Sequence, residues 1–209
     1  MIKLFLAIAL LGTSTLAAAH EVWIEREGSA PARIYLGEPA EPIPAGGDPE
    51  FAKLKAPRLV PSSRAAMVRR SDHIEVAAAA GDVRAWDDNV FAPWGPATKR
   101  EAVFYYARAG RSEPKAALPF EIVPVATGAD RFTVIRDGRP LADAEVTFVT
   151  PARETRKLRT DARGVVVVPS SGKGRYLLSA ATRDDGERQH GGTTIHALHH
   201  ITTITYNAG

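Results

Sequence analysis

The chain has 209 residues, a formal net charge of +3 at pH 7 and no cysteine. This length suits one large domain or two small ones, and the small, dispersed charge argues against a nucleic-acid-binding surface. Without cysteine there is no disulfide, no thiolate nucleophile and no thiolate metal ligand. A methionine-rich copper(I) site is also excluded, because Met1 and Met67 are the only methionines.

The first 19 residues have the three parts of a secretory signal peptide. Lys3 supplies the positive charge, Leu4 to Leu11 form the apolar core, and Ala17 to Ala19 supply the small residues before a cleavage site. The apolar run is too short to span a bilayer. We therefore predict an exported, periplasmic protein with a signal peptide over residues 1–19 and a mature chain that begins at His20.

The first half of the mature chain predicts strands separated by turns. The segment "EVWIE" after His20 alternates apolar and charged residues, as a half-buried strand does, and "ARIYLGE" predicts a second strand that ends at a glycine. Residues 39–50 are too rich in Pro and Gly for a regular element, whereas "PEFAKLKA" predicts a short helical turn. Residues 73–86 begin as a strand and break near Gly81, and further strands are predicted over residues 100–110 and 118–125.

The second half has a more regular rhythm of strands. The segment "RFTVIRDGRPLADAEVTFVT" predicts two strands around an Asp137-Gly138 turn that needs positive φ. "KLRTDARGVVVVP" predicts a strand, a turn and a valine strand, and "GRYLLSAAT" and "TTIHALHHITTITY" predict the last two strands. This rhythm, without a persistent helix pattern, predicts an all-β fold of two β-sandwich modules. We place their boundary in "ATGAD", which gives modules of residues 20–127 and 128–209.

Several of these segments resemble known families. "IRDGRPLADAEVTF", "RTDARGVVVVP" and "GRYLLSAA" resemble, in order, the strand, turn and Gly-x-Tyr strand of the carboxypeptidase-regulatory-like, transthyretin-like sandwich. The resemblance implies that fold for the C-terminal module. The segments "AHEVWIE", "LGE", "FEIVP" and "HHITTITY" resemble the periplasmic DUF4198 family, which includes NikM-like components of nickel and cobalt uptake. This second resemblance implies an exported metal-handling or metal-uptake protein.

His20 is the residue from which we predict a metal site. If cleavage follows Ala19, His20 carries a free α-amino group, whose ordinary pKa of about 7.7–8.0 lets a metal displace its proton. The amine and the ring Nδ1 then close a six-membered chelate, and a second imidazole would complete a three-nitrogen site suited to Cu(II) or Ni(II). Cleavage after Ala17 would instead leave Ala18-Ala19-His20, a square-planar chelator of the same metals. The alternative is that His20 merely follows the cleavage site.

The second imidazole is expected from the closing strand, which contains His196, His199 and His200. On a strand, His196 and His200 share a face about 13 Å apart and His199 points to the other face, so the three cannot form a closed site by themselves. The segment "HITTITY" resembles the family ending His-x-Ala-Thr-Leu-Thr-Phe, which implies His200 as the partner of His20, with His199 and His196 as reserves. The alternative is that all three lie at the surface and bond neighbouring threonines.

Three functions remain open. We expect a carrier or uptake accessory, not an enzyme, that binds a divalent transition metal (nickel, cobalt or copper) and works with an inner-membrane transporter or a TonB-dependent outer-membrane receptor. The alternative is a metal-free β-sandwich that serves as a binding or scaffold protein of the cell envelope. A copper-dependent oxygenase, which also begins with histidine, is less favoured because the sequence lacks a matching central histidine motif and disulfides. Neither a Gly-x-Ser-x-Gly elbow nor a His-Glu-x-x-His motif occurs.

Overall fold

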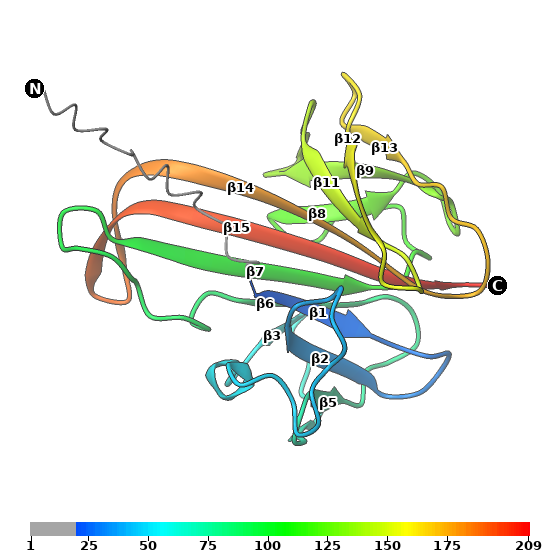
Figure 1. Ribbon diagram of the computed structural model, residues 1–209, viewed down its shortest axis with the longest axis horizontal. Coiled ribbons are helices and arrows are strands. Elements are labelled where there is room, and N and C mark those ends of the chain that lie inside the picture. Colours follow the sequence, from blue (N-terminus) through cyan, green and yellow to red (C-terminus); the bar gives the residue numbers. More distant parts are fainter. Residues whose placement is uncertain (1–19) are drawn as a thin grey trace, which may run out of the picture.

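The computed structural model describes residues 20–209, whose regular structure is almost entirely β-strand (Figure 1). The predicted all-β sandwich class is therefore confirmed. A single 3₁₀ turn among these residues, η1 (Phe51–Lys53), lies where the sequence predicts a short helical turn. The predicted signal peptide lies outside the described residues. Within residues 20–209, no helix is long and apolar enough to cross a membrane.

The strands of the described residues form three sheets. The central sheet has seven strands: β3 (Arg58–Val60), β6 (Val83–Asp87), β7 (Glu101–Ala109), β11 (Glu145–Val149), β12 (Thr155–Arg159), β14 (Gly174–His190) and β15 (Thr193–Ala208). Their order across the sheet is β12-β11-β14-β15-β7-β6-β3. A second sheet contains β1 (Glu21–Glu25), β2 (Ala32–Gly37), β5 (Ile74–Val76) and β4 (Met67–Arg69), in that order. The third contains β8 (Phe120–Pro124), β9 (Arg131–Arg136), β10 (Arg139–Pro140) and β13 (Val165–Val167).

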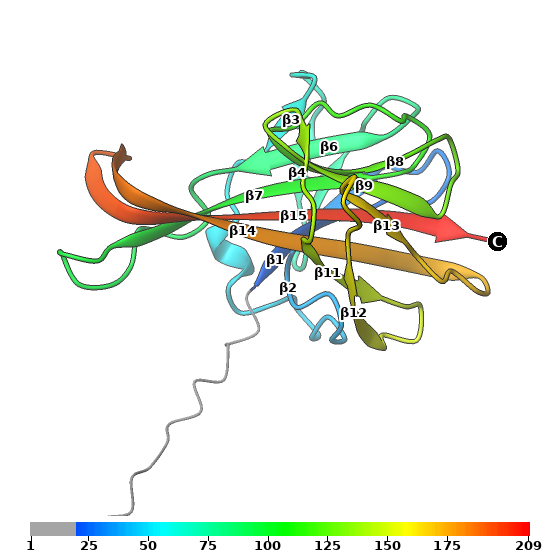
Figure 2. The same ribbon diagram turned by 90° about the horizontal axis from the view of Figure 1, so that it is seen from above.

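The two outer sheets cover opposite faces of the central sheet (Figure 1). Neighbouring residues of a strand point to opposite faces, so Tyr105 of β7 packs into the core shared with β1 and β2, whereas Tyr106 packs into the core shared with β8 and β9. Each core is apolar and dominated by aliphatic and aromatic side chains, whose removal from water stabilises the fold. At one end, the β14–β15 hairpin and the loop before β7 extend beyond the outer sheets (Figure 2).

The central sheet combines strands from both predicted modules. The strands β3, β6 and β7 belong to residues 20–127, and the other four belong to residues 128–209. The parallel pair of β7 and β15 joins them, with Glu101 opposite Ala197 and Ala109 opposite Thr205. The two sandwiches therefore share their middle layer. The division between residues 127 and 128 stays a prediction about independent folding.

Two turns that the sequence predicts are present in the structure. Asp137 and Gly138, between β9 and β10, have φ values of 50° and 76°, the left-handed conformations that a tight hairpin turn requires. Gly164, with φ of 73°, donates its N–H to the carbonyl oxygen of Asp161 at 2.9 Å and closes the turn before β13.

Side chains of β15 hold β1 on the central sheet. Hydrogen bonds run from Thr203 to the carbonyl oxygen of Val22 at 2.8 Å, from Thr205 to that of Ile24, and from Asn207 to that of Arg26 at 2.9 Å. Because the partners advance together by two residues, β1 and β15 run in the same direction. The face of β15 that carries Thr203 and Thr205 is therefore the face covered by β1.

A buried ion cluster joins β8 to β6 and β7. Glu121 accepts hydrogen bonds from Arg84 Nε and Arg108 Nη1, each at 2.7 Å, and all three side chains are almost completely buried. Its second oxygen accepts the backbone N–H groups of Ala117 and Leu118. Both oxygens of this carboxylate therefore accept two hydrogen bonds each. A buried charge is tolerated only when its hydrogen bonds are satisfied in this way.

Candidate metal-binding site

His20 lies immediately before β1, with its side chain 27% exposed. Its Nε2 atom lies 3.1 Å from Oδ1 of Asp48, and its ring meets the ring of Phe91 edge-on, with centroids 6.2 Å apart. No residue of the described chain makes a hydrogen bond to Nδ1. The ring is therefore held through Nε2 and one edge, while Nδ1 remains free to bind another group.

Asp48 is held in place by its own loop. Its Oδ1 atom also accepts the N–H of Glu50 at 2.7 Å, and its carbonyl oxygen accepts the N–H of Phe51 at 3.0 Å, which starts η1. Gly37 makes room for this carboxylate at the end of β2, since a Cβ atom there would come within 3.1 Å of Asp48 Oδ2. Because Gly37 pairs with Glu21, the same glycine places Asp48 next to the start of β1.

The contact with Asp48 determines the tautomer of His20. An ionised carboxylate can only accept a hydrogen bond, so Nε2 carries the proton and donates it to Asp48. In the neutral ring, the lone pair is then on Nδ1. Histidines that bind metals usually donate their other ring N–H to a carboxylate or carbonyl in this way, which orients the ring and makes it a better ligand.

Glu21, the next residue, points to the central sheet. Its Oε1 atom accepts a hydrogen bond from Ser179 Oγ of β14 at 2.6 Å. Burial raises the pKa of Glu21 to about 7, against the opposing effects of this hydrogen bond and of Lys157. Glu21 thus fixes the start of β1 over the sheet and leaves the His20 side chain on the side of Asp48.

His200 lies on the opposite face of the central sheet from β1. Its Nδ1 atom is 3.2 Å from the hydroxyl of Tyr106, and its Nε2 atom is 3.0 Å from Asp184 Oδ2 and 2.9 Å from Arg136 Nη2. Burial and the nearby Arg136 lower the pKa of His200, although Asp184 acts against them. The resemblance to the family ending implies His200 as the partner of His20. The structure instead places the two side chains on opposite faces of the central sheet. The alternation of faces along β15, which the sequence does predict, is the physical reason.

The two reserve histidines are also engaged elsewhere. His199 lies on the face that β1 covers, but its Nε2 atom is 2.6 Å from Glu101 Oε2 and its ring stacks on Trp94 at a centroid distance of 5.8 Å. His196 has a buried Nδ1 atom with no hydrogen-bond partner among the described residues. Within residues 20–209, no three His, Asp or Glu side chains are grouped closely enough to hold a metal ion. The described chain therefore offers the ring Nδ1 of His20, with Asp48 bound to the other ring nitrogen, rather than a closed ligand set.

The sequence does not reveal the role of Asp48. The segment "GGDPE" has the composition of a turn, and an aspartate at such a place predicts a hydrogen bond to the backbone two residues on, which Glu50 provides. Nothing in the local pattern indicates that this turn folds back onto His20, 28 residues earlier.

The described residues thus define an all-β sandwich protein with a partly exposed histidine and its supporting carboxylate at the start of the first strand. The family model for a domain of unknown function, DUF4198, matches residues 64–184, more than half of the chain, and the protein belongs to this family. The matched part contains neither His20 nor the closing strand. Comparison with the curated proteins and with the solved structures gave no match.

Proposed function

We propose that the protein is an exported carrier or uptake accessory for a divalent transition metal, nickel, cobalt or copper. The metal is cargo, and His20 binds it through its α-amine and ring Nδ1 after removal of residues 1–19. The observation that supports this proposal most is the hydrogen bond from His20 Nε2 to Asp48, since it directs the lone pair to the chelating nitrogen.

The donor set suits delivery better than storage. Two nitrogens from one residue occupy adjacent positions around Cu(II) or Ni(II) and leave the remaining positions to water or to ligands of a partner. A partner can then bind the metal before His20 releases it. The exposure of the His20 side chain allows such an approach. The resemblance to NikM-like components supports the same function, in the periplasm, with an inner-membrane transporter or a TonB-dependent receptor as the partner.

The experiment compares two forms of the protein that differ at the first residue. One form begins at His20, and the other has an N-acetylated methionine before it, which converts the α-amine of His20 into an amide and leaves no other free α-amine. Calorimetry with Cu(II) and with Ni(II) is expected to give one site well below micromolar Kd for the first form. The extended form should bind much more weakly, because an amide nitrogen must lose a far less acidic proton to bind the metal.

A matched variant separates this site from the other histidines. His200→Gln should leave the affinity of the His20 form unchanged, since His200 lies on the other face of the sheet. Equal affinities of the two N-terminal forms would refute the terminal chelate and leave a metal-free binding or scaffold protein as the alternative.

A further inference from the structure

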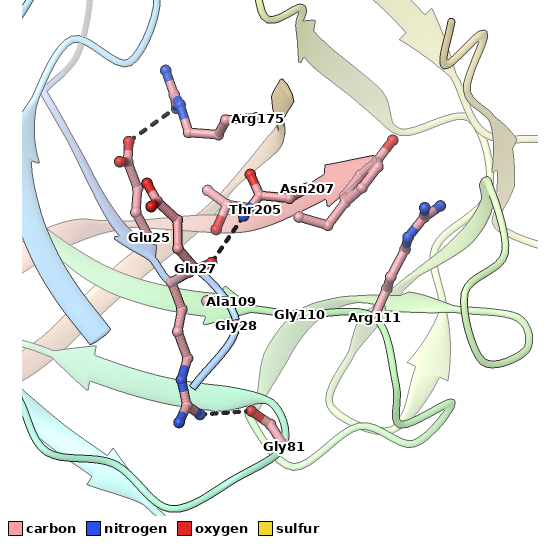
Figure 3. Close-up of a pocket in the computed structure, with 12 residues that line it drawn as sticks. Glu25, Glu27, Gly28, Gly81, Ala109, Gly110, Arg111, Arg175, Thr205 and Asn207 are labelled. Carbon is pink, nitrogen blue, oxygen red and sulfur yellow. Dashed lines mark hydrogen bonds and ion pairs between the residues drawn. The ribbon is translucent and has the colours of Figure 1, made fainter. Parts of the chain in front are cut away.

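A second site lies at the opposite end of β1 from His20. The strands β1, β7 and β15 run in the same direction, and the residues at their ends enclose a cavity of about 250 Å³ (Figure 3). Gly28, Gly81 and Gly110 lie around it and leave space between the strand ends. This volume is slightly below that of pockets for drug-sized molecules, so the cavity suits a smaller ligand.

The wall formed by Arg26 is rigid. Its guanidinium group donates four hydrogen bonds to backbone carbonyls, those of Ala30, Ala78, Ala79 and Gly81. Its own carbonyl accepts the amide of Asn207 at 2.9 Å. These bonds connect the end of β1 to the loop before β6 and to the end of β15. The cavity is therefore held open by structure that does not depend on a ligand.

Acidic and basic side chains both line this cavity, and Arg175 lies beside Glu25 on the same side. Figure 3 shows Glu25 and Glu27 on one side and Arg111 on the other, with Thr205 and Asn207 between them. Oε1 of Glu25 accepts a hydrogen bond from Trp23 and forms an ion pair with Arg175. Oε1 of Glu27 accepts a hydrogen bond from Arg33. Within residues 20–209, the second oxygen of each carboxylate makes no hydrogen bond.

Arg111 is prepared for an anionic group. Its guanidinium lies over the ring of Tyr206 at 4.4 Å from the centroid, and Nη1 bonds Asp130 and the carbonyl oxygen of Ala129. Its Nε and Nη2 atoms make no hydrogen bond to any part of the described chain. The side chain is 19% exposed, so a carboxylate that reached it would form a charge-assisted bond in a partly desolvated place.

We propose that this cavity binds a small zwitterion, an α-amino acid or short peptide, with the ammonium group at Glu25 and Glu27 and the carboxylate at Arg111. Neither a simple anion nor a simple cation uses both sides. The site is separate from the metal site, and its occupancy does not depend on the proposed function.

Calorimetry in metal-free buffer tests this site with glycylglycine, N-acetylglycylglycine and glycylglycinamide. We expect glycylglycine to bind, and each blocked form to bind about tenfold to a hundredfold more weakly, since each loses a charged hydrogen bond. Glu27→Gln, at a side chain that is 76% exposed, should weaken glycylglycine binding about twofold to fivefold without affecting folding. Glu187→Gln, on the β14–β15 hairpin, is the matched control and should have no effect.

Arg111 is tested in two ways, because its bond to Asp130 also contributes to folding. Arg111→Gln should weaken binding about as much as blocking the carboxylate does, and Arg111→Lys, which keeps the charge but not the planar fork, should retain part of the lost affinity. Thermal denaturation verifies that both variants are folded. The proposal is wrong if glycylglycine does not bind at millimolar concentration, or if either blocked form binds as tightly as glycylglycine.

Discussion

The hydroxyl of Thr203 donates a hydrogen bond to the carbonyl oxygen of Val22 at 2.8 Å. This contact assigns β1, and with it His20, to one face of β15. His200 is three residues before Thr203 and points to the other face, where it contacts Tyr106, Asp184 and Arg136. The proposed metal site therefore depends on His20 and Asp48, and not on the closing strand.

The same contact predicts a loss of stability. Thr203→Val keeps the shape of the side chain but leaves the buried carbonyl of Val22 without its partner, which should lower the free energy of unfolding by about 1–3 kcal/mol. Urea denaturation measures the change. Thr203→Ser should recover most of it, and Thr155→Val, at an exposed position of β12, should change little. A loss no larger than that of Thr155→Val would show that the contact does not hold β1 in place.

Asp48 predicts a change in metal affinity. Asp48→Asn keeps an oxygen that can accept the N–H of Glu50, so the turn is preserved. The neutral oxygen is a weaker acceptor for His20, so we expect affinity for Cu(II) or Ni(II) to fall about tenfold in the form that begins at His20. Calorimetry provides the measurement, and Glu41→Gln in the same loop is the control. Unchanged affinity would mean that Asp48 does not orient the ring.

Glu121 predicts the largest effect on folding. Glu121→Gln leaves the buried guanidinium groups of Arg84 and Arg108 without their shared counter-ion, and should cost about 3–5 kcal/mol. Glu113→Gln removes an ion pair of Arg84 whose carboxylate side chain is 54% exposed, and should cost less than about 1 kcal/mol. Chemical denaturation of the two variants distinguishes these values. Similar losses would contradict the role assigned to the buried cluster.

His200 predicts a dependence of stability on pH. Because burial and Arg136 lower its pKa in the folded protein, the unfolded chain binds a proton at His200 more readily. The neutral side chain therefore makes its full contribution above the unfolded pKa of about 6.5, and this contribution falls as the pH decreases toward the folded pKa. His200→Gln should reduce the loss of stability between neutral and mildly acidic pH. His190→Gln, at the tip of the β14–β15 hairpin, is the control, and equal pH profiles of His200→Gln and the unmutated protein would refute this role.

The local features of the fold follow from the sequence. The alternation in "EVWIE" predicts β1, and the Asp137-Gly138 pair predicts the turn between β9 and β10, because both depend on neighbouring residues only. The same periodicity correctly predicts that His199 and His200 point to opposite faces.

The arrangement of the sheets depends on contacts between distant residues. The pairing of β7 with β15 joins residues about 96 positions apart, such as Glu101 and Ala197, and no local pattern specifies it. The contact between His20 and Asp48 is of the same kind, since it requires β2 and the following loop to return to the start of β1. For this reason the sequence identifies His20 as a candidate ligand but does not show which side chain lies beside it. The expected partner, His200, lies on the other face of the central sheet.

Electron paramagnetic resonance of bound Cu(II) tests the terminal chelate most directly. In the form that begins at His20, we expect hyperfine coupling to the amine nitrogen and one imidazole, with coupling to the amine lost when an N-acetylated methionine precedes His20. The His200→Gln variant should give the same spectrum as the form that begins at His20. Identical spectra from the two N-terminal forms would contradict the proposal that the first amine and ring bind the metal.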